Sequence, residues 1–164
     1  MKVLRYSITI ILAAFITVSA VKAQSISAWK IKDVVQYMNN SDSVLVVNFW
    51  ATFCKPCIEE IPYIESISKK YKDQKVKVLL ISVDIPGFFP GKVESFVKKN
   101  NYASQVVWLN ESNADYFCPK IDKKWSGVIP ATVIINTKTG YKKFIEEQME
   151  PKQFEAELKK ALGI

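Results

Sequence analysis

Apolar residues along the chain fall into two patterns: short continuous runs, and longer segments in which they recur every three or four positions. The continuous runs are rich in β-branched and aromatic residues, so they predict strands that are buried in a sheet. These runs cover residues 44–50, 76–83, 106–109, 131–136 and 141–145. The last two flank a turn sequence that ends in Gly140, which predicts a β-hairpin.

The segments with helical periodicity lie between and after these runs. They predict helices near residues 31–38, 54–71, 93–97 and 151–162, with a further short helix within 113–124. Pro62 predicts a kink in the second helix, and the prolines and glycines of residues 84–91 predict a loop. Strands that alternate with helices predict an α/β fold, in which helices cover both faces of one sheet.

The amino-terminal segment has the features of an export signal. Lys2 and Arg5 precede an apolar stretch at residues 8–18, and small-residue cleavage patterns end at Ala20 and at Ala23. The apolar stretch is short for a spanning helix, which needs about 20 residues. We expect cleavage, and the alternative is an uncleaved amino-terminal membrane anchor.

The sequence therefore divides into a signal peptide at residues 1–23 and one domain at residues 24–164. Cleavage would leave a soluble protein in the periplasm or cell envelope, with membrane contact only if the signal stays attached. Cleavage would also remove three of the 23 basic residues, so that 20 basic and 16 acidic residues give a net charge of +4. The charges are mixed along the predicted helices, which argues against nucleic-acid binding.

Composition excludes several classes of protein. With 49% hydrophobic and 24% charged residues, the chain is neither disordered nor a multi-span membrane protein. It contains 0 His, which excludes Ser-His and Cys-His catalytic pairs and any His-ligated metal. Its 3 Cys are too few for a small protein held together by disulfides.

Two of the cysteines, Cys54 and Cys57, lie where the strand predicted at residues 44–50 leads into a helix. Two thiols at this spacing can close a small disulfide ring. The first thiol lies at the helix start, where free backbone N–H groups and the helix dipole favour the thiolate, and Lys55 adds a positive charge. Cys57, one turn further on, is placed to attack a mixed disulfide on Cys54.

Other roles for this pair are a zinc site and a purely structural disulfide. A zinc knuckle needs four ligands, whereas the chain offers three cysteines and no histidine. A structural disulfide suits an exported protein but does not explain a position on a strand-to-helix turn. We expect the third cysteine, Cys118, to be a buried apolar side chain, and the alternative is a redox role.

Residues 47–57, with the sequence VNFWATFCKPC, resemble the active-site signature of the thioredoxin-like family, and most closely its TlpA/ResA-like branch of exported thiol–disulfide oxidoreductases. Phe53 stands where that branch usually has Trp. Pro62 matches the proline of the family's active-site helix, and residues 129–132 resemble its cis-proline loop. The resemblance extends over residues 28–163.

The resemblance implies a thioredoxin fold with a central mixed sheet, and thiol–disulfide exchange with protein substrates. It implies that Cys54 attacks a disulfide and that Cys57 resolves the mixed disulfide. The peptide bond before Pro130 is expected to be cis, and Ile129, Pro130 and Trp50 are expected to contact the substrate. Neither a cofactor nor a metal is implied.

The resemblance also favours one direction of reaction, the reduction of protein disulfides with electrons from a donor that the sequence does not identify. One alternative is a disulfide-forming oxidase that resembles DsbA, although the chain lacks that group's large helical insertion and its Pro-His pair between the cysteines. Another alternative is a thioredoxin-fold module that binds a partner without turnover.

One departure from the classical pattern concerns proton transfer. Classical thioredoxins carry a buried Asp where this chain has Asn48, a substitution that is usual in the TlpA/ResA-like branch. Asp84, which follows the strand predicted at residues 76–83, is the nearest candidate acid, and the alternative is a turn or capping residue.

Trp125 is expected in the core or at the rim of a substrate groove.

Overall fold

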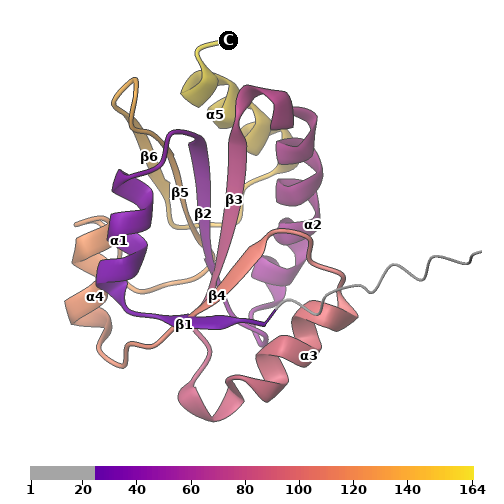
Figure 1. Ribbon diagram of the computed structural model, residues 1–164, viewed down its shortest axis with the longest axis vertical. Coiled ribbons are helices and arrows are strands. Elements are labelled where there is room, and N and C mark those ends of the chain that lie inside the picture. The colour runs from indigo at the N-terminus through magenta and orange to yellow at the C-terminus, as the bar shows by residue number, and fades with distance from the viewer. Residues whose placement is uncertain (1–24) are drawn as a thin grey trace, which may run out of the picture.

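The computed structural model describes residues 25–164, and the predicted signal peptide at residues 1–23 lies outside the described residues. One six-stranded sheet runs through the molecule (Figure 1). Its strands are β1 (Ser27–Trp29), β2 (Val44–Trp50), β3 (Val76–Ser82), β4 (Gln105–Leu109), β5 (Ala131–Asn136) and β6 (Tyr141–Ile145). The five strands that the apolar runs predict are all present.

The order of the strands in the sheet is β1-β4-β3-β2-β5-β6. Strands β1, β4, β3 and β2 are parallel, whereas β5 lies antiparallel to β2, and β6 lies antiparallel to β5. Parallel strands need crossover connections, which the helices supply, and the antiparallel pair needs only the predicted hairpin turn. The α/β class and the central mixed sheet are therefore confirmed.

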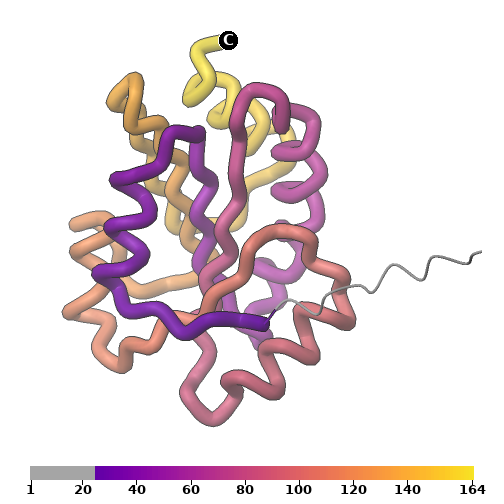
Figure 2. The backbone as a smooth tube through the Cα atoms, in the orientation of Figure 1, coloured from indigo at the N-terminus to yellow at the C-terminus, as the bar shows by residue number. Residues whose placement is uncertain are grey.

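Helices cover both faces of this sheet (Figures 1 and 2). One face packs against α1 and α4, and the other packs against α2, α3 and α5. The helices are α1 (Ile31–Asn39), α2 (Lys55–Lys70), α3 (Gly91–Lys99), α4 (Ala114–Ile121) and α5 (Pro151–Leu162), with short 3₁₀ helices η1 (Lys72–Gln74) and η2 (Pro86–Phe88). Within residues 25–164, no helix has the length and hydropathy that crossing a membrane requires.

At the centre of the sheet lies β2, whose residues are all buried. Successive side chains of a strand point to opposite faces of the sheet. Accordingly, Leu45, Val47 and Phe49 pack with α1 and α4. Val44 and Val46 pack with α2 and α5. Burial on both faces explains why this strand is a continuous apolar run in the sequence.

The hydrophobic pattern does not predict β1. This strand has only three residues, and two of them are exposed. It forms beside β4, with Ser27 opposite Val107 and Trp29 opposite Leu109. A strand this short owes its conformation to pairing with its neighbour rather than to its own sequence.

The connections that follow β2, β3 and β6 and the one that precedes β5 lie at the same end of the sheet. Strands β2 and β3 both end there, because Trp50 lies opposite Ser82. The antiparallel β5 begins there, with Ala131 opposite Phe49, and β6 ends there at Ile145. Ligands of open α/β sheets bind outside the carboxyl ends of the parallel strands, so this end is where a site is expected.

Candidate active site

Cys54 and Cys57 form a disulfide at the amino terminus of α2, with their Cα atoms 5.3 Å apart. Cys54 is the N-cap residue of the helix, and its Sγ accepts a hydrogen bond from the Cys57 backbone N–H at 3.3 Å. Cys54 keeps 8% of its surface exposed, whereas Cys57 is fully buried. An approaching partner therefore meets Cys54 first.

The surroundings of Cys54 favour a negative charge on its sulfur. No acidic residue lies in the first turn of α2, where free N–H groups and the helix dipole attract an anion. Lys55 follows Cys54 directly, and its ammonium group forms a 3.7 Å surface ion pair with Glu59 that contributes little to stability. A helix start of this kind favours a thiolate over a thiol at the N-cap position.

The acid predicted from the sequence, Asp84, is buried behind the loop that leads to Cys54. Its Oδ1 accepts a hydrogen bond from the Thr52 hydroxyl at 2.6 Å. Its Oδ2 accepts from the Thr52 backbone N–H at 3.0 Å and from the Ser82 hydroxyl at 2.8 Å. Hydrogen bonds to a charged acceptor contribute about 1.5–3 kcal/mol each. The Asp84 carboxylate therefore fixes the loop that carries the first cysteine.

A second buried acid, Glu60, is one that the sequence reasoning misses. It lies three residues after Cys57 on the same face of α2 and is fully buried. Its Oε1 accepts a hydrogen bond from the Asn48 side-chain amide at 2.6 Å, and its Oε2 accepts one from the Met149 backbone N–H at 3.3 Å. The same amide donates to the Thr132 hydroxyl at 2.9 Å. The spacing from Cys57 is the signal that points to Glu60.

Burial raises the pKa of Glu60 from 4.5 to about 7, because removal from water penalises the carboxylate. The hydrogen bonds from Asn48 and Met149 act in the opposite direction and limit the rise. A carboxyl group with this pKa gives up and accepts a proton readily near neutral pH. Glu60 thus joins Asp84 as a candidate for proton transfer.

The loop before β5 lies next to the two cysteines. Its Ile129–Pro130 peptide bond is cis, which confirms the prediction. Ile129 is half-buried against the apolar cluster that contains Cys54 and Cys57, and Pro130 is buried. Val128, the residue before this pair, is exposed. The loop therefore presents a short accessible segment beside the dithiol.

Trp50 lies in the core, contrary to its predicted contact with the substrate. Its side chain is fully buried. The alternation of β2 directs it into the cluster that includes α3, where its ring packs against Phe96 and Tyr102 at centroid distances of 5.8 and 5.5 Å. Trp50 supports the active-site loop from the core side instead of contacting a partner.

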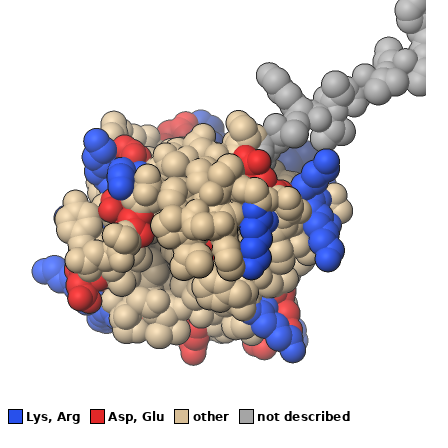
Figure 3. Space-filling model, turned by 90° about the horizontal axis from the view of Figure 1, so that it is seen from below, with Lys and Arg blue, Asp and Glu red and all other residues tan. Residues whose placement is uncertain are grey.

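Three apolar side chains are exposed around the disulfide. Phe53 precedes Cys54, Ile85 follows Asp84, and Val128 precedes the cis-proline pair, and each exposes more than half of its surface. Figure 3 views this end of the molecule, where a broad uncharged area occupies the middle and most charged side chains lie toward the rim. Exposed apolar surface with a polar rim is typical of a protein-binding site.

The third cysteine, Cys118, is buried and forms no disulfide, as predicted. Burial raises the pKa of its thiol to about 11, with smaller contributions from Glu146 and Asp115. Its Sγ lies 3.9 Å from the position that a Cβ on Gly127 would take, so it packs behind the loop before β5. Trp125 is buried and belongs to the core, one of the two predicted locations.

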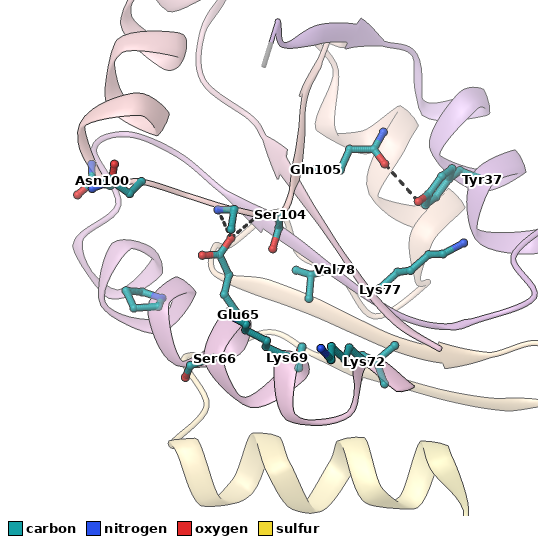
Figure 4. Close-up of a pocket in the computed structure, with 15 residues that line it drawn as sticks. Tyr37, Glu65, Ser66, Lys69, Lys72, Lys77, Val78, Asn100, Ser104 and Gln105 are labelled. Atoms are coloured by element: carbon teal, nitrogen blue, oxygen red, sulfur yellow. Dashed lines mark hydrogen bonds between the residues drawn. The ribbon is translucent and has the colours of Figure 1, made fainter. Parts of the chain in front are cut away.

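A cavity of about 670 Å³ lies away from the disulfide, between α2, β3 and the segment that leads into β4 (Figure 4). On one side, the Glu65 carboxylate accepts hydrogen bonds from the backbone N–H groups of Ala103 and Ser104 at 2.9 and 2.8 Å. On another side, the Tyr37 hydroxyl lies 3.3 Å from Gln105. Neither active-site cysteine lines this cavity, so it is separate from the dithiol.

The sheet order, the CxxC disulfide at the start of α2 and the cis-proline loop beside it define a thioredoxin-fold protein of the thiol–disulfide exchange class. The chain belongs to the Redoxin family, whose model matches residues 22–162. A thioredoxin-related protein from Neisseria meningitidis serogroup B superposes with a TM-score of 0.60 at 26% identity, covering 75% of this chain and 84% of that one. Across residues 25–164, no cluster of three or more His, Cys, Asp or Glu side chains suits a metal ion.

Two curated relatives carry the name thiol-disulfide oxidoreductase ResA. The protein from Halalkalibacterium halodurans is 29% identical over 90 residues, which cover 55% of this chain and 46% of the relative. The protein from Geobacillus kaustophilus is 28% identical over 112 residues, which cover 68% of this chain and 59% of the relative. The chain spans about half the length of these relatives. The resemblance to the TlpA/ResA-like branch is confirmed.

The raised pKa of Glu60 makes the stability of the disulfide form depend on pH. Between the unfolded value of 4.5 and the folded value of about 7, the native state holds a proton that the unfolded state has released. Stability therefore falls as the pH rises through this range. We expect Glu60 to lower the free energy of unfolding by about 3 kcal/mol between about pH 4 and about pH 8.

Urea unfolding of the wild type and the Glu60→Gln variant measures this contribution as the difference between their free energies of unfolding. That difference should decrease by the stated amount as the pH rises, because only the wild type carries the titrating carboxyl. Glu59→Gln, a change at the neighbouring exposed acid, is the matched control and should give a difference that is flat with pH. A flat difference for Glu60→Gln as well would show that the Glu60 carboxyl has an ordinary pKa.

Proposed function

We propose that this protein is a thiol–disulfide oxidoreductase that reduces disulfide bonds in other proteins. The observation that carries the proposal is the asymmetry of the CxxC pair, in which Cys54 keeps a small exposed surface at the helix start and Cys57 is fully buried. A purely structural disulfide needs no such asymmetry. The exposed apolar side chains around the pair suit contact with a polypeptide, and the name of the ResA relatives supports the activity.

The reduced protein carries out the reaction in two steps. The Cys54 thiolate attacks one sulfur of a substrate disulfide, which forms a mixed disulfide and releases the other sulfur as a thiolate that takes up a proton. The Cys57 thiol then loses its proton and attacks the Cys54 sulfur, which forms the Cys54–Cys57 disulfide and releases the second substrate thiol. Two electrons pass from the dithiol to the substrate, and an external dithiol donor must return them.

The second step needs a base, because a buried thiol resists ionisation. Glu60 lies one helical turn from Cys57 in the same buried environment, and its pKa of about 7 suits proton acceptance. Asp84 lies on a different element from Cys57, and its oxygens accept hydrogen bonds from Ser82 and from Thr52 in the loop before Cys54. We therefore assign to Glu60 the role of accepting the proton from Cys57. We assign to Asp84 the role of positioning the active-site loop.

The substrate chain binds beside the cis-proline loop. Ile129 and Pro130 lie next to Cys54, so an extended segment that carries the disulfide would meet the sulfur and the loop together. Phe53 and Val128 offer exposed apolar surface to residues on either side of that disulfide. This arrangement selects for polypeptide substrates over small disulfides.

The location of the protein is part of the proposal. The features of residues 1–23 support export to the periplasm or cell envelope, where disulfides form and persist. A reductase in such a compartment would act on incorrectly formed protein disulfides. Its electrons must come from another dithiol protein, because the compartment itself is oxidising.

Trapping of mixed disulfides tests the roles of the two cysteines. The Cys57→Ser variant keeps the attacking thiol and lacks the resolving one, so it should accumulate a covalent complex with insulin, visible on a non-reducing gel. The Cys54→Ser variant should trap about tenfold less or none, because the buried Cys57 is not accessible to the substrate.

The matched control is Cys118→Ser, which should reduce insulin at the wild-type rate because its thiol is buried and has a raised pKa. Equal trapping by the Cys57→Ser and Cys54→Ser variants would show that the roles are assigned wrongly. A wild type that binds insulin but never reduces it would favour the binding module over the reductase.

The pH dependence of the resolving step distinguishes Glu60 from Asp84. In a single-turnover experiment, the decay of the mixed disulfide in the wild type should accelerate as the pH rises through about 7, since the Glu60 carboxyl then becomes a base. Glu60→Gln should lose this acceleration and slow the step by about 10²-fold near neutral pH, a typical loss for a general base.

The comparison variant is Asp84→Asn, in which the loop anchor is weakened and the carboxyl of Glu60 is kept. It should retain the acceleration near pH 7 even if its overall rate is lower. The opposite result, with the acceleration kept in Glu60→Gln and lost in Asp84→Asn, would return the proton-transfer role to Asp84.

A further inference from the structure

Glu146 follows β6 and lies against the loop that ends in the cis-proline pair. Its Oε1 accepts a hydrogen bond from the Ser126 backbone N–H at 2.8 Å and another from the Ser126 hydroxyl at 2.5 Å. The same oxygen accepts a third from the Val128 backbone N–H at 3.0 Å. Burial disfavours the charged form, but the hydrogen bonds outweigh burial and lower the pKa of Glu146. One carboxylate oxygen therefore gathers three donors from the loop.

The same loop has a second support on its core side. The indole N–H of Trp125 donates to the Val128 carbonyl at 2.9 Å, and the Trp125 ring is held against Phe49 at a centroid distance of 4.4 Å. Gly127 has a φ of +96°, a conformation that favours glycine. The N–H of Val128 is thus bound by Glu146 and its carbonyl by Trp125, so the backbone of this exposed residue is fixed at both ends.

The contacts of Glu146 do not involve the reacting sulfurs. Among residues 25–164, its hydrogen-bond partners are Ser126 and Val128. It lies outside the CxxC motif and outside the cis-proline segment in sequence, directly after β6 at the edge of the sheet. Its hydrogen bonds therefore connect it to the substrate-binding region through the loop.

We propose that Glu146 is a positioning residue for substrate binding, whose carboxylate holds the Ser126–Val128 segment in the conformation that receives a substrate chain. The proposal rests on the proposed function, since it concerns how a protein disulfide is bound. A loop that is fixed in advance loses less conformational entropy when the substrate binds. The fixed loop stabilises the bound complex and the transition state equally. Loss of the Glu146 carboxylate should therefore raise KM and leave kcat unchanged.

Steady-state reduction of insulin by Glu146→Ala, compared with reduction of hydroxyethyl disulfide, tests the proposal. Insulin needs the loop, whereas the small disulfide needs only Cys54. We expect the KM for insulin to rise about tenfold, as loss of one charge-assisted hydrogen bond would give, with kcat and the rate on the small disulfide unchanged. Glu146→Gln keeps the accepting oxygen without the charge and should show a smaller rise in KM.

The matched controls are Glu147→Ala and Glu147→Gln, which remove the same charge at the exposed neighbouring position and should behave as the wild type. If Glu146→Ala does not fold, the pair Glu146→Gln and Glu147→Gln decides. An unchanged KM in the Glu146 variants, or an equal loss on both disulfides, would overturn the proposal while leaving the reductase function intact. Failure of the proposed function would show separately, as a wild type that does not reduce insulin.

Discussion

The junction between β2 and α2 is the constraint on which the rest of the site depends. β2 is buried on both faces, which fixes the position of the strand that leads the chain to α2. It enters α2 through Cys54, which is both the N-cap of the helix and the more exposed of the two cysteines. The unpaired N–H groups and the dipole of the helix act on this sulfur because the fold puts it there. Cys57, one turn further on, must then lie in the core.

Three carboxylates hold the segments that surround this junction, and each comes from a different element. Asp84 binds the loop that leads from β2 to Cys54. Glu60 joins α2 to the side chain of Asn48 and to the backbone after β6. Glu146 binds the loop that carries the cis-proline pair. A buried or half-buried acid costs free energy unless it is hydrogen-bonded, and here each cost is offset by fixing one part of the site.

Most of the fold could be predicted from the sequence because its signals are local. β2 is buried on both faces, so its sequence is a continuous apolar run. α5 is buried on one face, so its apolar residues recur at helical spacing. The CxxC pair and Pro130 were equally visible, since their chemistry depends on residue type and spacing. What could not be predicted depends on tertiary contacts. β1 forms through pairing with β4. Trp50 is buried because its side chain points to the face of the sheet that α3 covers. Glu146 looks like an ordinary surface acid until the fold brings donors to it, and the spacing of Glu60 from Cys57 does not reveal its hydrogen-bond partners.

The central claim is that the Cys54–Cys57 pair serves as an electron donor to protein disulfides. The equilibrium reduction potential of the Cys54–Cys57 pair, measured against glutathione, tests this claim most directly, because it reports the balance between dithiol and disulfide. A reductase should have a potential close to that of thioredoxin, about −270 mV, so that it gives electrons to protein disulfides. A potential close to that of DsbA, about −120 mV, would contradict the account and identify the pair as an oxidant.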